Sequence, residues 1–198
     1  MSTTAKENCT MPKLETFEWD NIWWEQTGNI SARRILYIGD SISCSTRHQI
    51  TKLSNGEILC DGFGTSKALD NPYLIPAIEL CMQQSKCDAI LFNNGLHGKH
   101  LSPEEYGCCL DAVLSFLSKT GKPVFVVLST DDIVHPERSE RVRVRNAVAE
   151  KLAEKHGFPV VDLYSVSVEN SQLHIQDGVH FTEQGYEQLA KCILAALR

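Results

Sequence analysis

Short apolar runs alternate along the chain with longer stretches of helical period. Five runs are predicted to be buried strands, at residues 34–39, 57–60, 88–93, 124–128 and 160–163. Helices are predicted at residues 46–53, 73–85, 137–156 and 182–197, and a further helix begins at Ser102 and ends before Gly121. Strands that alternate with helices form βαβ units and a parallel sheet. We therefore expect a flavodoxin-like three-layer α/β/α fold with a five-stranded parallel sheet.

The first 30 residues have no clear period, although they contain all three tryptophans of the chain. We expect residues 1–30 to form an N-terminal arm packed on a single domain of residues 31–198. The aromatic side chains of this arm either cover part of the core or form a platform on which a sugar stacks; burial is the commoner use of aromatic residues.

The composition of the chain argues against some classes of binding partner. The chain has 198 residues and a net charge of −6, with acidic and basic residues scattered, which argues against nucleic acid and anionic membranes. No apolar run reaches membrane-spanning length and no signal peptide is visible, so the expected location is the cytoplasm, or a secreted or periplasmic one if a signal peptide was removed. The eight cysteines are expected to be free thiols, and without a CxxC pair a structural zinc site is not predicted. We expect no metal and no cofactor.

Residues suited to chemistry follow the predicted strands. Ser41 comes after the first strand, Gly64 after the second, residues 94–98 after the third, and residues 177–180 precede the last helix. Because ligands of open α/β sheets bind beyond the carboxyl ends of the strands, these segments should converge on one site.

Ser41 is the candidate nucleophile of this site. A serine hydroxyl needs a base within hydrogen-bond reach, and His180 can be that base. Asp177 lies three residues before His180, so one loop can hold both, and its carboxylate would orient the imidazole and stabilise the imidazolium. Taken alone, Ser41 is equally consistent with a helix cap.

Two segments resemble a known family. Residues 37–42, Tyr-Ile-Gly-Asp-Ser-Ile, look like block I of the SGNH/GDSL hydrolases, and residues 177–180, Asp-Gly-Val-His, look like their block V. The resemblance covers residue 34 to the C-terminus. It implies a serine esterase that acts through an acyl-Ser41 intermediate on a small-molecule or carbohydrate acyl ester, O-acetyl sugars included.

The resemblance also implies an oxyanion hole, which this chain matches less closely. Gly64, or else Gly62, would supply a backbone N–H. The family's Gly-x-Asn-Asp segment is replaced here by residues 92–98, Phe-Asn-Asn-Gly-Leu-His-Gly, which puts His97 at the position of the family's asparagine. The third donor is therefore His97, Asn94 or Asn93.

Other functions remain open at this point. The same residues would serve an acyltransferase, and a catalytically silent binding domain could keep the fold. His97 and His100 are three residues apart, but a metal site would need another ligand. His135 is expected at the surface, and the basic residues between positions 138 and 145 on a solvated helix face.

Overall fold

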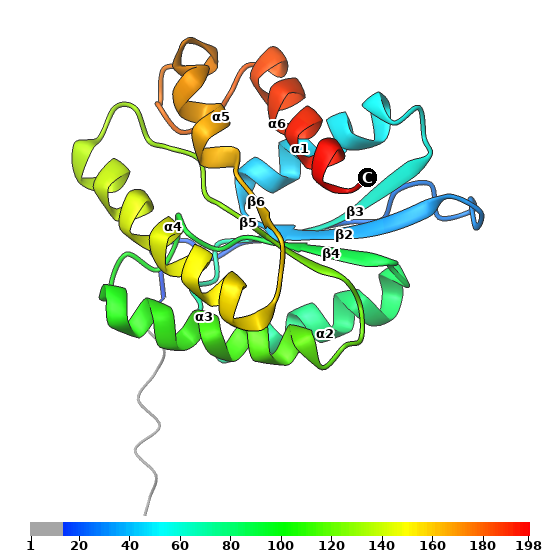
Figure 1. Cartoon of the computed structure of the whole chain (residues 1–198), viewed down its shortest axis with the longest axis horizontal. Coiled ribbons are helices and arrows are strands. Elements are labelled where there is room, and N and C mark those ends of the chain that lie inside the picture. Colours follow the sequence, from blue (N-terminus) through cyan, green and yellow to red (C-terminus); the bar gives the residue numbers. More distant parts are fainter. Residues whose placement is uncertain (1–13) are drawn as a thin grey trace, which may run out of the picture.

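The computed structural model describes residues 14–198. Its centre is one six-stranded sheet of order β1-β3-β2-β4-β5-β6 (Figure 1). Five of the strands run parallel, and β1 pairs antiparallel with β3 at the edge. The strands are β1 (Asp20–Trp23), β2 (Arg33–Gly39), β3 (Ile58–Thr65), β4 (Ala89–Phe92), β5 (Val124–Val127) and β6 (Val160–Val161).

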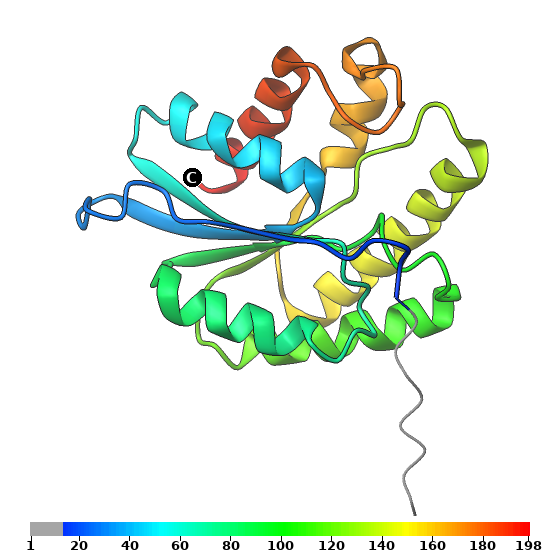
Figure 2. The same cartoon turned by 180° about the vertical axis from the view of Figure 1, so that it is seen from behind.

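Helices cover both faces of the sheet, which gives the predicted three layers. Helices α1, α5 and α6 lie on one face and α2, α3 and α4 on the other (Figures 1 and 2). Their bounds are α1 (Ser41–Leu53), α2 (Leu74–Ser85), α3 (Pro103–Ser118), α4 (Pro136–His156), α5 (Leu163–Glu169) and α6 (Glu183–Ala196), with a 3-10 turn, η1, at Ser171–Leu173.

The central strand β2 is apolar on both sides because both of its faces are covered. Ile35 and Tyr37 pack in the cluster formed with α1 and α6, whereas Leu36 and Ile38 pack in the cluster formed with α2, α3 and α4. The continuous apolar run of residues 34–39 is therefore explained by alternation between two cores.

Local signals fix where the helices begin and end. Ser102 and Glu105 form a capping box at the start of α3, with Pro103 at its first position. Gly157 ends α4 in the left-handed conformation, at φ 69°.

The sheet differs from the prediction in its number of strands. The five predicted parallel strands are present, but residues 20–23 add a sixth strand at the edge of β3. The second predicted strand was also too short: β3 continues to Thr65, so Gly64 lies inside a strand and not in the loop that follows it. The prediction failed here because pairing with β1 on one side and β2 on the other extends β3 through a glycine-rich segment of low strand propensity.

The aromatic residues of the N-terminal segment differ in burial. Trp24 packs against the core formed with α2 and α3, while Trp23 is partly exposed and lies against His48 and Arg47. Cys9 lies outside the described residues, and the seven cysteines within them carry free thiols. None of the helices between residues 14 and 198 is both long enough and apolar enough to cross a membrane.

Candidate active site

Ser41 lies where β2 ends and α1 begins. Asp40 caps the helix, since its Oδ1 accepts a hydrogen bond from the Ile42 N–H at 2.9 Å. The Ser43 hydroxyl donates to the Asp40 carbonyl oxygen at 2.7 Å and holds the turn from the other side. Ser41 is therefore the first residue of α1, where backbone N–H groups have no carbonyl partner inside the helix and the dipole is positive.

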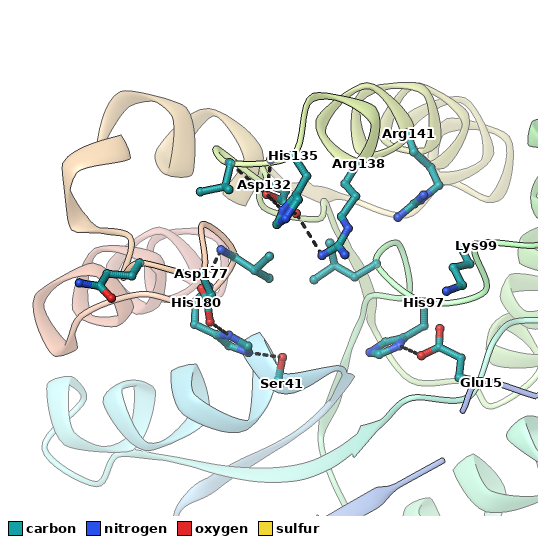
Figure 3. A pocket seen from close by; sticks show the side chains of 14 residues that line it. Glu15, Ser41, His97, Lys99, Asp132, His135, Arg138, Arg141, Asp177 and His180 are labelled. Atoms are coloured by element: carbon teal, nitrogen blue, oxygen red, sulfur yellow. Dashed lines mark hydrogen bonds and ion pairs between the residues drawn. The ribbon is translucent and has the colours of Figure 1, made fainter. Parts of the chain in front are cut away.

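A hydrogen-bonded chain joins Ser41 to His180 and His180 to Asp177 (Figure 3). The Nε2 atom of His180 lies 2.8 Å from Ser41 Oγ, and its Nδ1 atom lies 2.7 Å from Asp177 Oδ2. With the ring proton on Nδ1 directed at the carboxylate, Nε2 is free to take the proton of the serine hydroxyl. The structure thus brings together the three residues expected to form a triad.

The loop that carries Asp177 and His180 is held by its own carboxylate. Asp177 Oδ1 accepts hydrogen bonds at 2.9 Å from the backbone N–H groups of Val179 and His180. Desolvation raises the pKa of Asp177, but the hydrogen bonds from the His180 side chain and from these two N–H groups outweigh it and lower the pKa to about 2. Gly178 at φ 75° permits the tight turn between them.

Of the residues expected to supply oxyanion donors, Gly64 lies close to the turn that carries Ser41, whereas the amides of Asn93 and Asn94 donate hydrogen bonds elsewhere in the protein. An added Cβ on Gly64 would lie 3.3 Å from the Asp40 carbonyl oxygen, so the glycine backbone packs directly against the first turn of α1. Asn93 donates its amide to Val127 O and to Ser129 Oγ, which uses both of its N–H groups. One N–H of the Asn94 amide donates to Lys67 O at 2.8 Å.

His97 faces the pocket that contains Ser41. Its Nδ1 atom lies 3.1 Å from Glu15 Oε2, while Glu15 Oε1 accepts the Gly98 N–H at 3.2 Å. Burial raises the pKa of Asp40, and the charge of His97 is the strongest of the influences that oppose this rise. His97 is thus within electrostatic reach of the serine turn, and Glu15 orients its ring. Glu15 was not predicted, because it is 82 residues away from His97 in the chain.

The pocket has a volume of about 590 Å³, which lies within the usual range for small-molecule sites. Ser41, His180 and Asp177 lie along one side of it, and His97 and Glu15 lie along another (Figure 3). A substrate bound here would meet the serine hydroxyl and the His97 ring together.

A second aspartate–histidine pair lines the same pocket. Asp132 Oδ1 accepts the backbone N–H groups of Val134 and His135 at 3.1 and 3.0 Å, and it lies 3.0 Å from His135 Nδ1. The spacing and the bonding repeat those of Asp177 and His180. His135 was expected at the surface; it is half-exposed, but its ring lines the pocket, a position that only the folding of the 128–135 loop over the sheet edge reveals.

The basic residues at positions 138–145 were predicted to lie on a solvated face, which holds for Arg138 and Arg143 but not for Arg145. Arg145 is buried and donates to the carbonyl oxygens of Gly95, His97 and Gly98 at 3.0, 2.6 and 2.7 Å. Its guanidinium also lies 4.7 Å from the centre of the Tyr106 ring. The prediction was wrong because charge content alone cannot show that one arginine of a helix faces the unpaired carbonyls of a neighbouring loop.

Within residues 14–198, no three histidine, cysteine, aspartate or glutamate side chains are grouped as metal ligands. His100 instead pairs with Asp70 at 2.9 Å.

Comparison with solved structures agrees with this architecture. The acetyl xylan esterase AlAXEase superimposes with a TM-score of 0.69 at 17% identity, over 83% of this chain and 100% of that one. LAE5, an alpha/beta hydrolase enzyme from the metagenome of Lake Arreo, gives 0.68 at 17% identity, over 84% and 96%. A member of the lipolytic G-D-S-L family from Veillonella parvula gives 0.67 at 21% identity, over 83% and 97%. At these identities the likeness shows the fold alone.

Sequence comparison adds a match to one family model. No curated protein sequence matches the chain. The model of the GDSL-like lipase/acylhydrolase family matches residues 99–193, a segment that includes Asp177 and His180. Over this segment, which is just under half of the chain, and in its fold, the chain is similar to the GDSL-like lipases and acylhydrolases.

Proposed function

We propose that the protein is a serine esterase in which Ser41 attacks an acyl ester, His180 transfers the protons and Asp177 orients His180. The observation that carries this proposal is the unbroken hydrogen-bond chain Ser41–His180–Asp177 beside a pocket of about 590 Å³. A serine that only capped a helix would have no need of an imidazole at 2.8 Å, itself fixed by a carboxylate.

The first half of the reaction forms an acyl-enzyme. His180 Nε2 takes the hydroxyl proton as Ser41 Oγ attacks the carbonyl carbon. The resulting oxyanion is stabilised by the Ser41 backbone N–H at the positive end of α1. The tetrahedral intermediate then collapses, the ester C–O bond breaks, and His180 gives its proton to the departing alcohol.

The second half restores the enzyme. His180 takes a proton from a water molecule, whose oxygen attacks the acyl carbon. The bond to Ser41 Oγ breaks, the carboxylic acid leaves, and the proton returns to Ser41. Asp177 stays ionised throughout because its pKa is lowered to about 2, so it stabilises the imidazolium in both halves.

Small acyl groups on sugars are the first substrates to examine. One structural neighbour is an acetyl xylan esterase, and the pocket is large enough for a sugar unit beside the reacting ester. A panel of 4-nitrophenyl esters of increasing acyl length, together with acetylated xylo-oligosaccharides, would define acyl and alcohol preference.

The decisive experiment is labelling with a fluorophosphonate, followed by mass spectrometry of the modified peptide. The label should fall on Ser41, and Ser41→Ala should lose both label and turnover, the latter by on the order of a millionfold in kcat. Ser45→Ala, one turn further along α1, is the matched control and should keep both.

Other functions predict other outcomes. If the folded wild-type protein neither takes the label nor hydrolyses any ester, it is a binding domain and the proposal fails. If an added alcohol is acylated faster than water attacks, the protein is an acyltransferase that uses the same residues.

A further inference from the structure

Two arginines of α4 face the pocket that contains Ser41. Arg138, Arg141 and Arg145 are spaced by three and four residues, so they lie along one face of the helix. The guanidinium of Arg145 is hydrogen-bonded to carbonyl oxygens of the loop after β4, whereas Arg138 and Arg141 line the pocket. Figure 3 shows both reaching from α4 toward the pocket, and Lys99 reaching toward it from the loop after β4.

The acidic residues of the pocket are already engaged. Asp177 holds His180. Glu15 holds His97 and the Gly98 N–H. Asp132 holds His135, and Arg138 approaches its carboxylate only to 3.6 Å. Little negative charge inside the pocket is therefore left to neutralise added cations.

Arg141 and Lys99 have no counter-ion within the part of the chain that the structure describes. The Nε atom of Arg141 is, moreover, buried without a hydrogen-bond partner. These cations gather in a protein whose net charge is −6, so they do not follow from its overall composition.

The arrangement is held in place before any ligand binds. Because Arg145 donates to the carbonyls of Gly95, His97 and Gly98, it ties the middle of α4 to the loop that carries Lys99. Cations from two separate elements are thus kept on one side of the pocket. Such pre-organisation lowers the cost of binding.

We propose that Arg138, Arg141 and Lys99 bind an anionic group of the substrate, a carboxylate or a phosphate, while the ester carbonyl lies at Ser41. This inference rests on the proposed esterase function and names its substrate class as acyl esters that carry a negative charge. Guanidinium groups suit this role because their planar N–H pairs match the oxygens of both anions.

The test compares three acetyl esters of similar shape: 4-acetoxybenzoate, 4-acetoxyphenyl phosphate and the neutral 4-acetoxybenzamide. Each kcat/KM is divided by the rate of hydroxide hydrolysis of the same ester, so that intrinsic reactivity cancels. We expect at least one anionic ester to be preferred over the amide, chiefly through a lower KM, and the preference to shrink as salt is added. The better of the two anions identifies the group that the pocket takes.

Variants that remove one positive charge then show which residues cause the preference for anionic esters. Arg141→Gln and Lys99→Gln should each lower the ratio of anionic to neutral kcat/KM by roughly threefold to tenfold. Lys151→Gln is the matched control, since it removes the same charge from an exposed position of α4 outside the pocket and should leave the ratio unchanged. Urea unfolding of each variant shows that the fold is retained.

The outcomes separate this inference from the function on which it rests. If wild-type protein cleaves all three esters through Ser41 but prefers neither anion, or if Lys151→Gln lowers the ratio as much as Arg141→Gln does, the anion site is refuted and the esterase stands. If Ser41→Ala cleaves the esters as fast as wild type, the proposed function itself fails.

Discussion

His97 can donate a hydrogen bond to an oxyanion only in one protonation state. If Nδ1–H donates to Glu15, Nε2 of a neutral ring is an acceptor, and it becomes a donor when the ring is an imidazolium. The contact with Glu15 fixes the orientation of the ring, as a donor that replaces the asparagine of the family requires.

We predict that His97→Ala lowers kcat/KM by about 2.7–4 kcal/mol of transition-state stabilisation, the range for loss of one oxyanion donor. His97→Asn should retain much of the activity, because it restores an amide donor that needs no proton. Glu15→Gln should also weaken activity, because the ring of His97 loses the carboxylate that orients it. The measurement is kcat/KM against pH for all three variants. Loss of turnover in Asn94→Ala with none in His97→Ala would assign the donor to Asn94 instead.

Asp177 should titrate far below an ordinary aspartate. Its folded pKa of about 2 lies below the unfolded value of about 3.9, so the ionised carboxylate stabilises the fold above pH 4 and this contribution is lost as the pH falls toward 2. Carbon-detected NMR of the Asp177 carboxyl should show the low midpoint. His180→Ala should raise it toward the unfolded value, and a midpoint that does not move would show that His180 does not hold the carboxylate.

Sequence reasoning could select Ser41, Asp177 and His180 as candidates, and predict that they meet, because each lies in a short motif whose chemistry is local. It did not find Glu15, Asp132 or the pocket-facing His135. The Glu15 carboxylate reaches His97 across 82 residues, and no pattern at either end records that contact. The Asp132–His135 pair does have a visible signal, since its Asp-x-x-His spacing is the same as that of Asp177 and His180.

At the scale of elements, Arg145 is the link between α4 and the loop after β4. Replacement with methionine keeps much of the apolar stem but leaves three carbonyl oxygens unpaired. We predict a loss of ~3–5 kcal/mol in the free energy of unfolding, because each buried acceptor left unsatisfied costs ~1–3 kcal/mol. Urea denaturation measures it.

Arg143→Met is the control on the same helix. Arg143 is exposed and pairs with Glu140 on the same helix, so its removal should change the stability by less than ~1 kcal/mol. Equal losses in the two variants would mean that Arg145 contributes helix propensity and not a link to the loop.

Some helix boundaries could be predicted from local sequence patterns and others could not. The cap at Ser102 and the stop at Gly157 were predictable because the bonds that define them lie within a few residues. The start of α1 was placed five residues late, since residues 41–45 include three serines and a cysteine of modest helix propensity. Packing of α1 on α6 and on the sheet overrides that weakness.

At the scale of the whole molecule, strand–helix alternation was sufficient to predict a parallel three-layer fold and the edge where the site lies. It could not predict β1, a short edge strand whose exposed Ile22 and Trp23 give no clear alternation. It also could not predict how α4 and the loop after β4 combine their cations on one side of the pocket, because that depends on how separate elements pack together.

The rate at which the buried cysteine thiols react reports on the stability of the whole fold. Burial raises the pKa of Cys81 to about 11 and raises those of Cys60 and Cys87 as well, so few of these thiols are ionised near pH 8 and none is accessible. Cys108 is exposed. In a Cys9→Ser background, Ellman's reagent should therefore modify Cys108 rapidly and the three buried thiols only as fast as the protein unfolds. Adding urea below the unfolding midpoint should speed this slow phase, since the buried cysteines belong to the two cores that cover the sheet and open only when the fold does. Fast modification of Cys60 in the native protein, or fewer than seven reactive thiols after denaturation, would contradict the closed core or the free-thiol state.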